Sequence, residues 1–253
     1  MSPPPVPTAA VTLTGVCKEF RPSWRRPPVR ALDALTLSIP AGQIFGLIGP
    51  NGSGKSTALK IVAGLLSPTA GECRVFGDAA GSAGAKARLG FLPEAPHFPR
   101  FLTAREFLLY CGELSGLAGG ELAGRADELL AWAGLAGAAE RATGTFSKGM
   151  AQRLGVAQAV VHAPDVVLLD EPASGLDPVG VRGLTRLIRG LKQDGRTVVL
   201  TSHFLPQIEE VCDRVALLHE GRLLREGAVG EFVGPAGGRL ERFYLDQFGG
   251  SAS

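Results

Sequence analysis

The sequence predicts an α/β protein in which a core of buried strands and helices carries a helical insertion. Continuous apolar runs such as Val166–Leu169 are typical of buried parallel strands. From about residue 95 to residue 162 the apolar residues instead repeat at helical spacing, beginning with a capping box at Thr103–Glu106. We therefore expect one domain over residues 8–230, with its core in 8–94 and 163–230 and a helical subdomain at about 95–162. Residues 231–253 are expected to form a short C-terminal tail.

The N-terminal part is expected to hold strands that alternate with turns. Apolar and polar residues alternate in Ala10–Val16, which indicates an edge-type strand, and again in Leu35–Ile39. Prolines in Phe20–Arg30 predict an exposed basic loop, which is either simply solvated or a contact for a nucleotide or an acidic partner. A short strand at Glu72–Phe76 and a loose segment at Gly77–Gly84 are expected to follow the first helix.

The remaining elements follow from periodicity and from turn residues. Strands are expected at Leu89–Glu94 and Arg196–Thr201, and helices at Glu121–Trp132, Ser147–Val161, Val181–Leu191 and Ile208–Cys212. Arg214–Leu224 is predicted to be a hairpin that turns at Glu220 and Gly221. In the glycine-rich tail we expect only a short amphipathic piece around Phe243 and Leu245.

A phosphate-binding loop is the strongest motif, because Gly49–Thr57 fits the pattern G-x-x-x-x-G-K-[ST]. Glycines allow successive backbone N–H groups to converge on one anion. Lys55 supplies an ammonium group for the β- and γ-phosphates, and Ser56 a hydroxyl for Mg²⁺. The apolar strand Gln43–Ile48 precedes the loop and a helix follows it, which argues against a chance glycine-rich turn. The loop residues are Gly49, Pro50, Asn51, Gly52, Ser53, Gly54, Lys55, Ser56 and Thr57.

Composition narrows the class of protein. With 45% apolar and 20% charged residues the chain is typical of globular proteins, and a net charge of +2 does not predict nucleic-acid binding. No apolar run reaches the length of about 18 residues that a membrane span needs. Cysteines and histidines are scattered, so we expect reduced thiols and no cysteine–histidine metal cluster. We expect a cytosolic protein, unless a partner holds it at a membrane.

Candidate catalytic residues follow the ends of two expected parallel strands, where such folds form their ligand crevice. Asp170 is the natural carboxylate for Mg²⁺, and Glu171 can polarise a water molecule that attacks the γ-phosphate. His203, at the end of the next strand, can hold that water or contact the γ-phosphate. The alternative is that Asp170 and Glu171 only cap a helix and that His203 is structural.

A second glycine turn opens a helix at Phe146–Met150. Ser147 is a good N-cap, and Gly149 exposes a backbone N–H at the helix start. This turn is a second potential anion site in a chain with a single phosphate loop, so a second copy of the chain could supply the phosphate. Capped helix starts are common, and the signal is weak when it stands alone.

Together these motifs resemble the nucleotide-binding domain of ATP-binding cassette (ABC) proteins over about residues 10 to 227. Gly49–Thr57 matches the Walker A loop of such proteins. Val166–Asp170 matches the Walker B strand, and Glu171 then stands in the position of the catalytic glutamate. His203 matches the switch histidine. The D-loop matches at Ser174, Gly175, Leu176 and Asp177, and the signature at Ser147, Lys148, Gly149 and Met150.

The resemblance implies a P-loop NTPase core with an N-terminal antiparallel β subdomain and an inserted α-helical subdomain. It also implies a head-to-tail homodimer that sandwiches two ATP molecules, each between one chain's Walker A loop and the other chain's signature. Adenine is expected to stack on Phe20, with Trp24 the weaker candidate. Ser56, Asp170 and Glu94 would hold Mg²⁺.

Two departures from the family pattern point to a subfamily. The signature reads Phe-Ser-Lys-Gly-Met instead of Leu-Ser-Gly-Gly-Gln, so Lys148 adds a positive charge beside the γ-phosphate. In the Q-loop Glu94 replaces the usual glutamine. Both variants look like those in the ATPases of two-component (ABC-2 type) exporters.

We therefore expect an ATPase that drives export through a separate integral membrane permease and is peripheral to the inner face of the membrane. The alternatives are a soluble ABC ATPase and a nucleotide switch that does not hydrolyse ATP. Glu171 and His203 are both present, which disfavours the switch. The transported substrate is not encoded in this chain.

Overall fold

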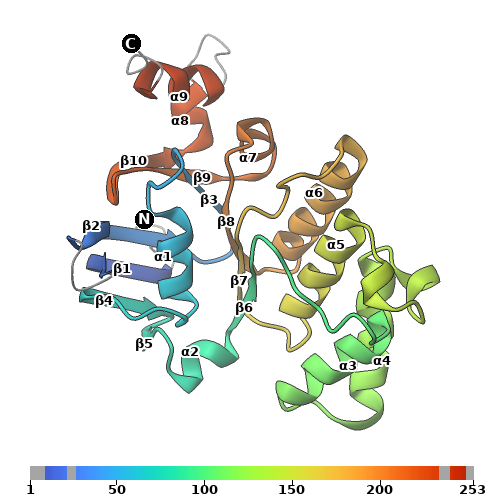
Figure 1. Ribbon diagram of the computed structural model, residues 1–253. Helices are drawn as coiled ribbons and strands as arrows, with labels where there is room; N and C mark the ends of the chain where they lie inside the picture. Colours follow the sequence, from blue (N-terminus) through green and yellow to red (C-terminus); the bar gives the residue numbers. More distant parts are fainter. Residues whose placement is uncertain (1–8, 22–26, 234–239, 249–253) are drawn as a thin grey trace, which may run out of the picture.

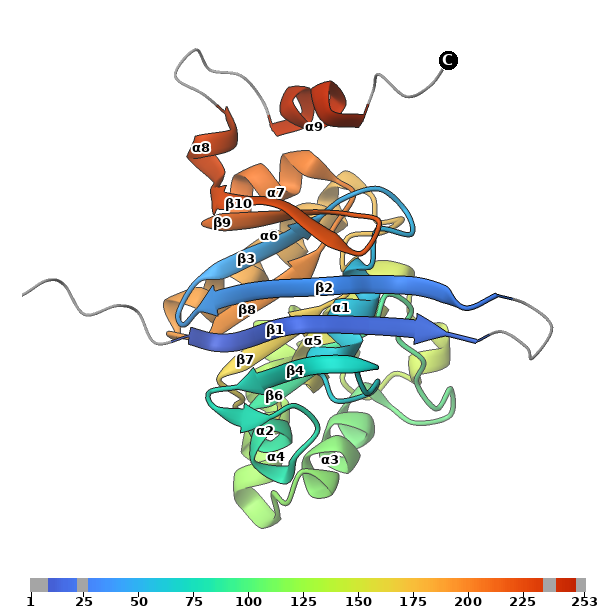
Figure 2. The same cartoon turned by 90° about the vertical axis from the view of Figure 1, so that its left-hand side faces the viewer.

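Two β-sheets form the frame of the molecule in the computed structural model, which describes residues 9–21, 27–233 and 240–248. A four-stranded antiparallel sheet has the order β2-β1-β4-β5, and a six-stranded sheet has the order β10-β9-β3-β8-β7-β6 (Figures 1 and 2). The first sheet comprises β1 (Ala9–Phe20), β2 (Val29–Pro40), β4 (Ala70–Val75) and β5 (Asp78–Ala79). The second comprises β3 (Ile44–Ile48), β6 (Leu89–Leu92), β7 (Val166–Leu169), β8 (Thr197–Thr201), β9 (Arg214–His219) and β10 (Arg222–Ala228).

Helices separate the two sheets and cover the far face of the larger one. Helix α1 (Lys55–Val62) lies between the sheets, whereas α5 (Lys148–Ala159) and α6 (Pro178–Gln193) lie on the other side of the six-stranded sheet (Figure 1). The inserted helices α3 (Ala104–Leu114) and α4 (Gly119–Trp132) pack beyond them. The shorter helices are α2 (Ala83–Ala87), α7 (Leu205–Val211), α8 (Val229–Val233) and α9 (Leu240–Phe248). None of the helices in the described ranges has both the length and the apolar character needed to cross a bilayer.

Each face of the six-stranded sheet has its own hydrophobic core, which explains the continuous apolar runs in its strands. Phe45 and Leu47 of β3 face the core shared with α1 and the antiparallel sheet. Ile44 and Ile48 of the same strand face the core shared with the helices. Since both faces are covered, β3, β7 and β8 are buried along their whole length.

Several sequence expectations about element boundaries are wrong. Strand β1 is not an edge strand, because it pairs with β2 on one side and β4 on the other. The predicted loop at Phe20–Arg30 begins after Phe20 and ends before Val29, since both residues are paired to each other in the sheet. The loose segment at Gly77–Gly84 contains β5 and the start of α2. The C-terminal hairpin continues through Ala228, beyond the expected end at Leu224.

The order of the parallel strands positions the candidate site. Strands β3, β8, β7 and β6 are consecutive neighbours and run parallel. Their carboxyl ends therefore meet at one edge of the sheet, where ligand crevices of open α/β sheets form. The residues that follow these ends are the phosphate loop, His203, Asp170 with Glu171, and Glu94.

Candidate nucleotide-binding site

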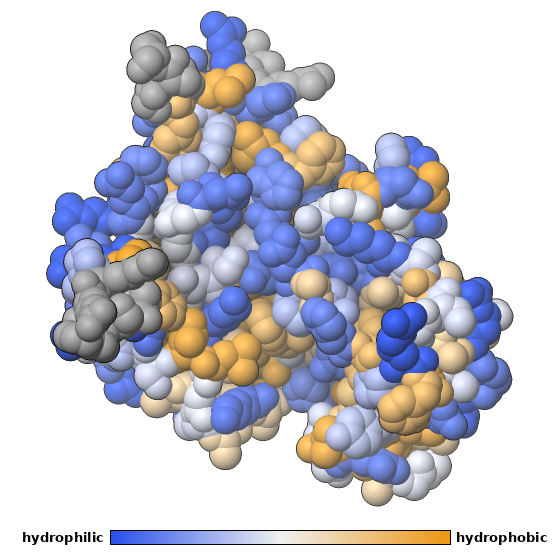
Figure 3. All heavy atoms as spheres, viewed as in Figure 1, coloured by the Kyte–Doolittle hydropathy of each residue, from blue (hydrophilic) through white to orange (hydrophobic). Residues whose placement is uncertain are grey.

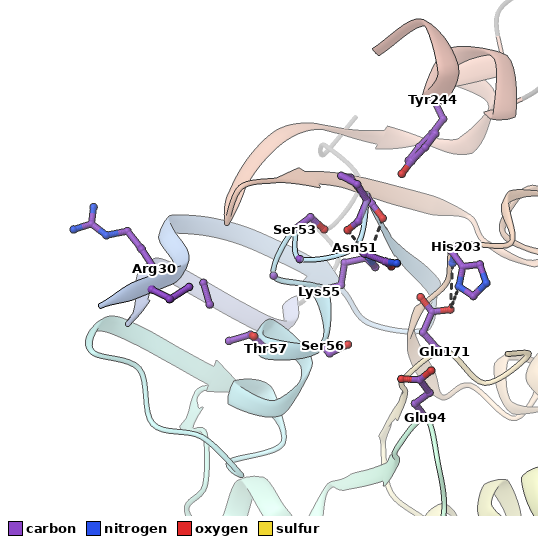
Figure 4. Close-up of a pocket in the computed structure, with 16 residues that line it drawn as sticks. Arg30, Asn51, Ser53, Lys55, Ser56, Thr57, Glu94, Glu171, His203 and Tyr244 are labelled. Atoms are coloured by element: carbon purple, nitrogen blue, oxygen red, sulfur yellow. Dashed lines mark hydrogen bonds and ion pairs between the residues drawn. The ribbon is translucent and has the colours of Figure 1, made fainter. Parts of the chain in front are cut away.

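A cavity of about 730 Å³ opens at this edge of the sheet. The whole of Gly49–Thr57 lines it, together with Glu94, Glu171 and His203 (Figure 4). The structure thus gathers, in one cavity, the loop and three further candidate residues that are far apart in the sequence. Val29, Arg30 and Ala31 of β2 and Tyr244 of α9 complete the lining.

The phosphate loop needs glycine for steric reasons at two positions. Gly49 and Gly54 have left-handed φ angles of 151° and 100°. A Cβ atom at Gly54 would lie 2.6 Å from the carbonyl oxygen of Ala31, and one at Gly49 would collide with the backbone of Leu218. Gly54 is the N-cap of α1 and offers no side chain to its first N–H groups. These groups are therefore available to an anion in the cavity.

Lys55 is almost completely buried, with 6% of its surface exposed. Its Nζ donates to the carbonyl oxygens of Gly49 at 2.8 Å and Pro50 at 3.0 Å, which holds the ammonium group inside the loop. Burial lowers the pKa of Lys55, while the carboxylates of Glu171 and Asp170 act in the opposite direction. The direct partners of this buried ammonium group are neutral carbonyl oxygens, so an anionic ligand in the cavity would stabilise its charge further.

Ser56 and Asp170 form the pair of oxygen donors that the sequence predicts for a metal. Ser56 Oγ donates to Asp170 Oδ1 at 2.8 Å, and Thr201 Oγ1 donates to the same oxygen at 2.7 Å. Asp170 is 3% exposed, so its orientation is held by the surrounding protein. Hydroxyl and carboxylate oxygens are the ligands that Mg²⁺ prefers, and this donor set fits that ion. Glu94 is an exposed carboxylate in the lining of the same cavity.

Glu171 and His203 are in direct contact. His203 Nδ1 lies 2.7 Å from Glu171 Oε2, and the backbone N–H of His203 donates to the same oxygen at 3.2 Å. Glu171 adopts a left-handed φ of 46°, which is unfavourable for a side chain of this size. Its backbone N–H donates to Thr201 Oγ1 at 2.8 Å, which stabilises that conformation. Such a strained backbone is a common feature of functional sites.

The predicted signature and D-loop lie next to each other, outside the lining of this cavity. Ser147 caps α5, because its Oγ accepts from the N–H of Met150 at 3.3 Å. Asp177 caps α6, accepting from the N–H of Gly180 at 2.6 Å. The Nζ of Lys148 lies against Gly175, so close that a Cβ atom there would collide with it. The positive charge that the sequence places near a γ-phosphate therefore rests on the D-loop of its own chain.

Among the described residues, Tyr244 and not Phe20 is the tyrosine or phenylalanine that lines the cavity. Phe20 is 38% exposed, packs under Lys18 with Nζ 5.3 Å from the ring centre, and does not line the cavity. Its strand partner Val29 does. Trp24 lies outside the described residues. Tyr244, which the sequence indicated only as part of an amphipathic tail, lines the cavity instead.

Comparison with known proteins agrees with this geometry. The ABC transporter family model matches residues 32–174, more than half of the chain. An uncharacterised ABC transporter ATP-binding protein of Synechocystis sp. is 40% identical over 237 residues, covering 91% of this chain and 66% of the relative. The daunorubicin/doxorubicin resistance ATP-binding protein DrrA of Streptomyces peucetius is 36% identical, covering 94% and 71%. The bacitracin transport ATP-binding protein BcrA of Bacillus licheniformis is 38% identical, covering 78% and 64%. The chain thus spans about two thirds of the length of these relatives.

Solved structures share the fold over most of the chain. The ATP-binding subunit of an ABC transporter superposes with a TM-score of 0.81 at 27% identity, covering 94% of this chain and 98% of that chain. A dimeric ATP-binding cassette in a post-hydrolysis state, bound to ADP and Pi, superposes with a TM-score of 0.78 at 28% identity, covering 86% and 98%. The predicted fold class and the resemblance are confirmed: this chain belongs to the ABC transporter family and has the fold of its ATP-binding cassettes.

Proposed function

We propose that this chain is the ATP-binding and ATP-hydrolysing subunit of an ABC exporter whose membrane permease is a separate polypeptide. One observation carries the proposal. A single cavity combines an anion-binding loop that holds a buried lysine, the Ser56 hydroxyl with Asp170 bonded directly behind it, and a carboxylate–histidine pair. This is the set of groups that phosphoryl transfer to water requires, namely phosphate binding, charge neutralisation and orientation of the attacking water.

Each group has a distinct role in the proposed reaction. The N–H groups at the start of α1 and the ammonium of Lys55 bind the phosphates. Ser56 and Asp170, with Glu94 across the cavity, would hold Mg²⁺, which neutralises phosphate charge when it is bound. Glu171 accepts a proton from the attacking water, and His203 orients Glu171 and the γ-phosphate. The left-handed backbone of Glu171 and its bonds to His203 and Thr201 support this preorganised role.

A head-to-tail homodimer would complete the site. Ser147 and Lys148 are exposed and lie outside the cavity of their own chain, which supports their use by a partner. In the proposed dimer the signature turn of one protomer faces the γ-phosphate on the other, so closure depends on ATP. The related cassette that is bound to ADP and Pi is itself a dimer.

The permease is expected to dock beside Glu94 and the helical insertion, with the chain at the inner face of the membrane. Phe101 and Leu114 are exposed by 82% and 71%, and apolar residues lie among hydrophilic ones over the helical part at the lower right of Figure 3. Exposed apolar patches mark interaction sites. Export as the direction of transport is supported by the similarity to DrrA and BcrA, whose names refer to drug resistance and to bacitracin transport. With a net charge of +2, nucleic acid is not an expected partner.

The Glu171→Gln variant tests the catalytic assignment. Loss of the general base is expected to lower ATP turnover by about 10²–10⁴-fold, while ATP binding is retained and an ATP-bound dimer accumulates. Steady-state phosphate release and gel filtration with ATP measure the two effects. Glu220→Gln is the matched control, because Glu220 also has a left-handed φ but lies in the exposed β9–β10 turn. Wild-type turnover in Glu171→Gln would refute the role of Glu171, and co-purification with a membrane protein tests the transporter assignment.

A further inference from the structure

Helix α9 is anchored to the body of the protein at its N-terminal end. Leu240 is completely buried, and its N–H donates to Glu209 Oε2 of α7 at 3.2 Å. One turn later the Phe243 ring meets Phe232 of α8 edge to face, with ring centres 5.1 Å apart. The guanidinium of Arg225 lies over both rings, 4.7 Å from Phe232 and 5.3 Å from Phe243. These contacts hold the helix in a defined position above the six-stranded sheet (Figure 1).

The opposite end of α9 is tied to the hairpin that supports the phosphate loop. Tyr244 packs on Phe248 with ring centres 4.8 Å apart, and Phe248 in turn lies 5.1 Å from the ring of His219 at the end of β9. Two residues further on, the N–H of Gly221 donates to the carbonyl oxygen of Ser53 in the phosphate loop at 3.1 Å. Tyr244 and the phosphate loop are therefore both attached to the β9–β10 hairpin, which fixes their relative position.

Tyr244 enters the cavity from the side of the phosphate loop. Its side chain points from α9 toward Asn51, across the cavity from Glu94, whereas Arg30 lies at the far end of the loop (Figure 4). Burial raises the pKa of the phenol, so its hydroxyl keeps its proton at neutral pH and is a hydrogen-bond donor. Within the described ranges this hydroxyl makes no hydrogen bond to the protein. The Tyr244 hydroxyl is thus an uncharged hydrogen-bond donor at a cavity whose lining includes the phosphate loop and Lys55.

We propose that Tyr244 is a nucleotide-binding residue whose hydroxyl donates a hydrogen bond to the phosphates of the nucleotide held by Gly49–Thr57. The inference rests on the proposed nucleotide site and adds to it a contact from the C-terminal helix. Position favours phosphate over base as the acceptor, because the Tyr244 side chain points toward Asn51 of the phosphate loop, whereas Arg30 lies at the other end of the cavity (Figure 4). Phe248 packs against the Tyr244 ring and restricts it, so less conformational entropy is lost when the contact forms.

Tyr244→Phe is the direct test, because it removes the hydroxyl and keeps the ring that packs on Phe248. ATP affinity is measured by equilibrium dialysis in EDTA, which withholds the metal that turnover requires. We expect about tenfold weaker binding, the typical loss for one hydrogen bond to a charged group. Tyr110→Phe is the matched control, since Tyr110 is the other tyrosine of the chain and lies half-exposed on α3. Unchanged or tighter ATP binding in Tyr244→Phe would overturn the proposal.

Two further measurements distinguish a direct contact at Tyr244 from an indirect effect of the substitution. Incorporation of 3-fluorotyrosine gives two ¹⁹F resonances, which the two phenylalanine variants assign. ATP is expected to shift the Tyr244 resonance and to leave the Tyr110 resonance in place, and an unmoved Tyr244 resonance contradicts direct contact. Lys55→Ala is run in parallel. If Lys55→Ala weakens binding and Tyr244→Phe does not, only the Tyr244 contact fails; if neither does, the nucleotide site itself fails.

Discussion

Two glycine turns open helices in this chain, yet they differ in what surrounds them. The turn before α1 is completed by its own chain: Lys55 is 6% exposed and bonded to two loop carbonyls, and Ser56 is bonded to Asp170. In the turn before α5, Ser147 and Lys148 are exposed, and its contacts are the cap of its own helix and the D-loop at Gly175. The side chains of Lys55 and Ser56 in the first turn are thus bonded within their own chain, whereas those of Ser147 and Lys148 in the second turn lie at the surface.

The difference shows how similar local sequences acquire different functions. Both turns present backbone N–H groups at a helix start, which favours anions. Only the first lies at the carboxyl edge of the parallel strands, where carboxylates, a histidine and a buried lysine converge. The second can serve an anion only if another molecule supplies it. Substitutions in one turn that leave the other unchanged test whether the two turns have these different roles.

Lys55→Ala is expected to have the largest effect on ATP binding. It removes the buried ammonium group, and we expect about 100-fold weaker binding by equilibrium dialysis, since charge-assisted hydrogen bonds to phosphate are among the strongest. Lys60→Ala, an exposed lysine of the same helix, is the control and should bind ATP normally. If Lys55→Ala and Lys60→Ala bind ATP with equal affinity, the prediction that the first turn binds the phosphates through Lys55 is wrong.

Ser147→Ala tests the second turn. If the signature acts on the partner's nucleotide, as the proposed dimer requires, ATP affinity of the monomer should be unchanged while turnover falls by about tenfold or more through loss of a transition-state contact. Loss of the N-cap also costs about 1 kcal/mol of helix stability. Ser82→Ala controls for this, since Ser82 caps α2 in the same way, accepting from Ala85 N at 3.2 Å. If Ser147→Ala weakens ATP binding to the monomer, the division between the two turns is wrong.

Lys148→Ala is expected to have a smaller effect. The lysine is exposed and lies on Gly175, so its removal should change the free energy of unfolding by less than about 0.5 kcal/mol. Turnover should fall a few-fold and depend less on salt, because the proposed dimer places this charge close to the partner's phosphate. Lys86→Ala is the surface control. A turnover whose salt dependence is unchanged in Lys148→Ala would show that this charge acts only within its own chain.

The smallest expected effect is on the pH dependence of folding stability, and it comes from His162, beyond the C-terminal end of the signature helix α5. It follows α5 and its Nε2 lies 3.2 Å from the carbonyl oxygen of Leu89 at the start of β6. Burial lowers its pKa in the folded state, so the unfolded chain takes up the proton first as pH falls. The contribution of the neutral, buried His162 to folding stability is therefore complete above the unfolded pKa of about 6.5. It is lost as pH falls through the lower pKa of the folded state. Urea titrations of His162→Gln should show a weaker decline of stability toward acid pH than wild type, with the exposed His97→Gln unchanged from wild type.

Contiguous features are predictable from the sequence, and features that depend on distant contacts are not. The phosphate loop and the Ser147 cap can be recognised because their residues are adjacent in the chain and their chemistry is local. The expected position of β1 is wrong because alternation reports that one face is buried, not how many neighbours a strand has. The tail is predicted as an amphipathic piece around Phe243 and Leu245, yet Leu245 is 57% exposed and Leu240 is the buried anchor. A single short helix does not reveal which side faces the protein when its partner surface is unknown.

By itself the sequence determined the chemistry of the two glycine turns and the groups that follow the parallel strands, because each is encoded within a few neighbouring residues. The tertiary structure decided which of these groups meet. The strand order β3-β8-β7-β6 brings Lys55, Asp170, Glu171, His203 and Glu94 to one edge and leaves the second turn outside. It also placed Tyr244, and not Phe20, at the cavity, because packing of α9 on α7, α8 and His219 depends on side chains from several distant segments at once.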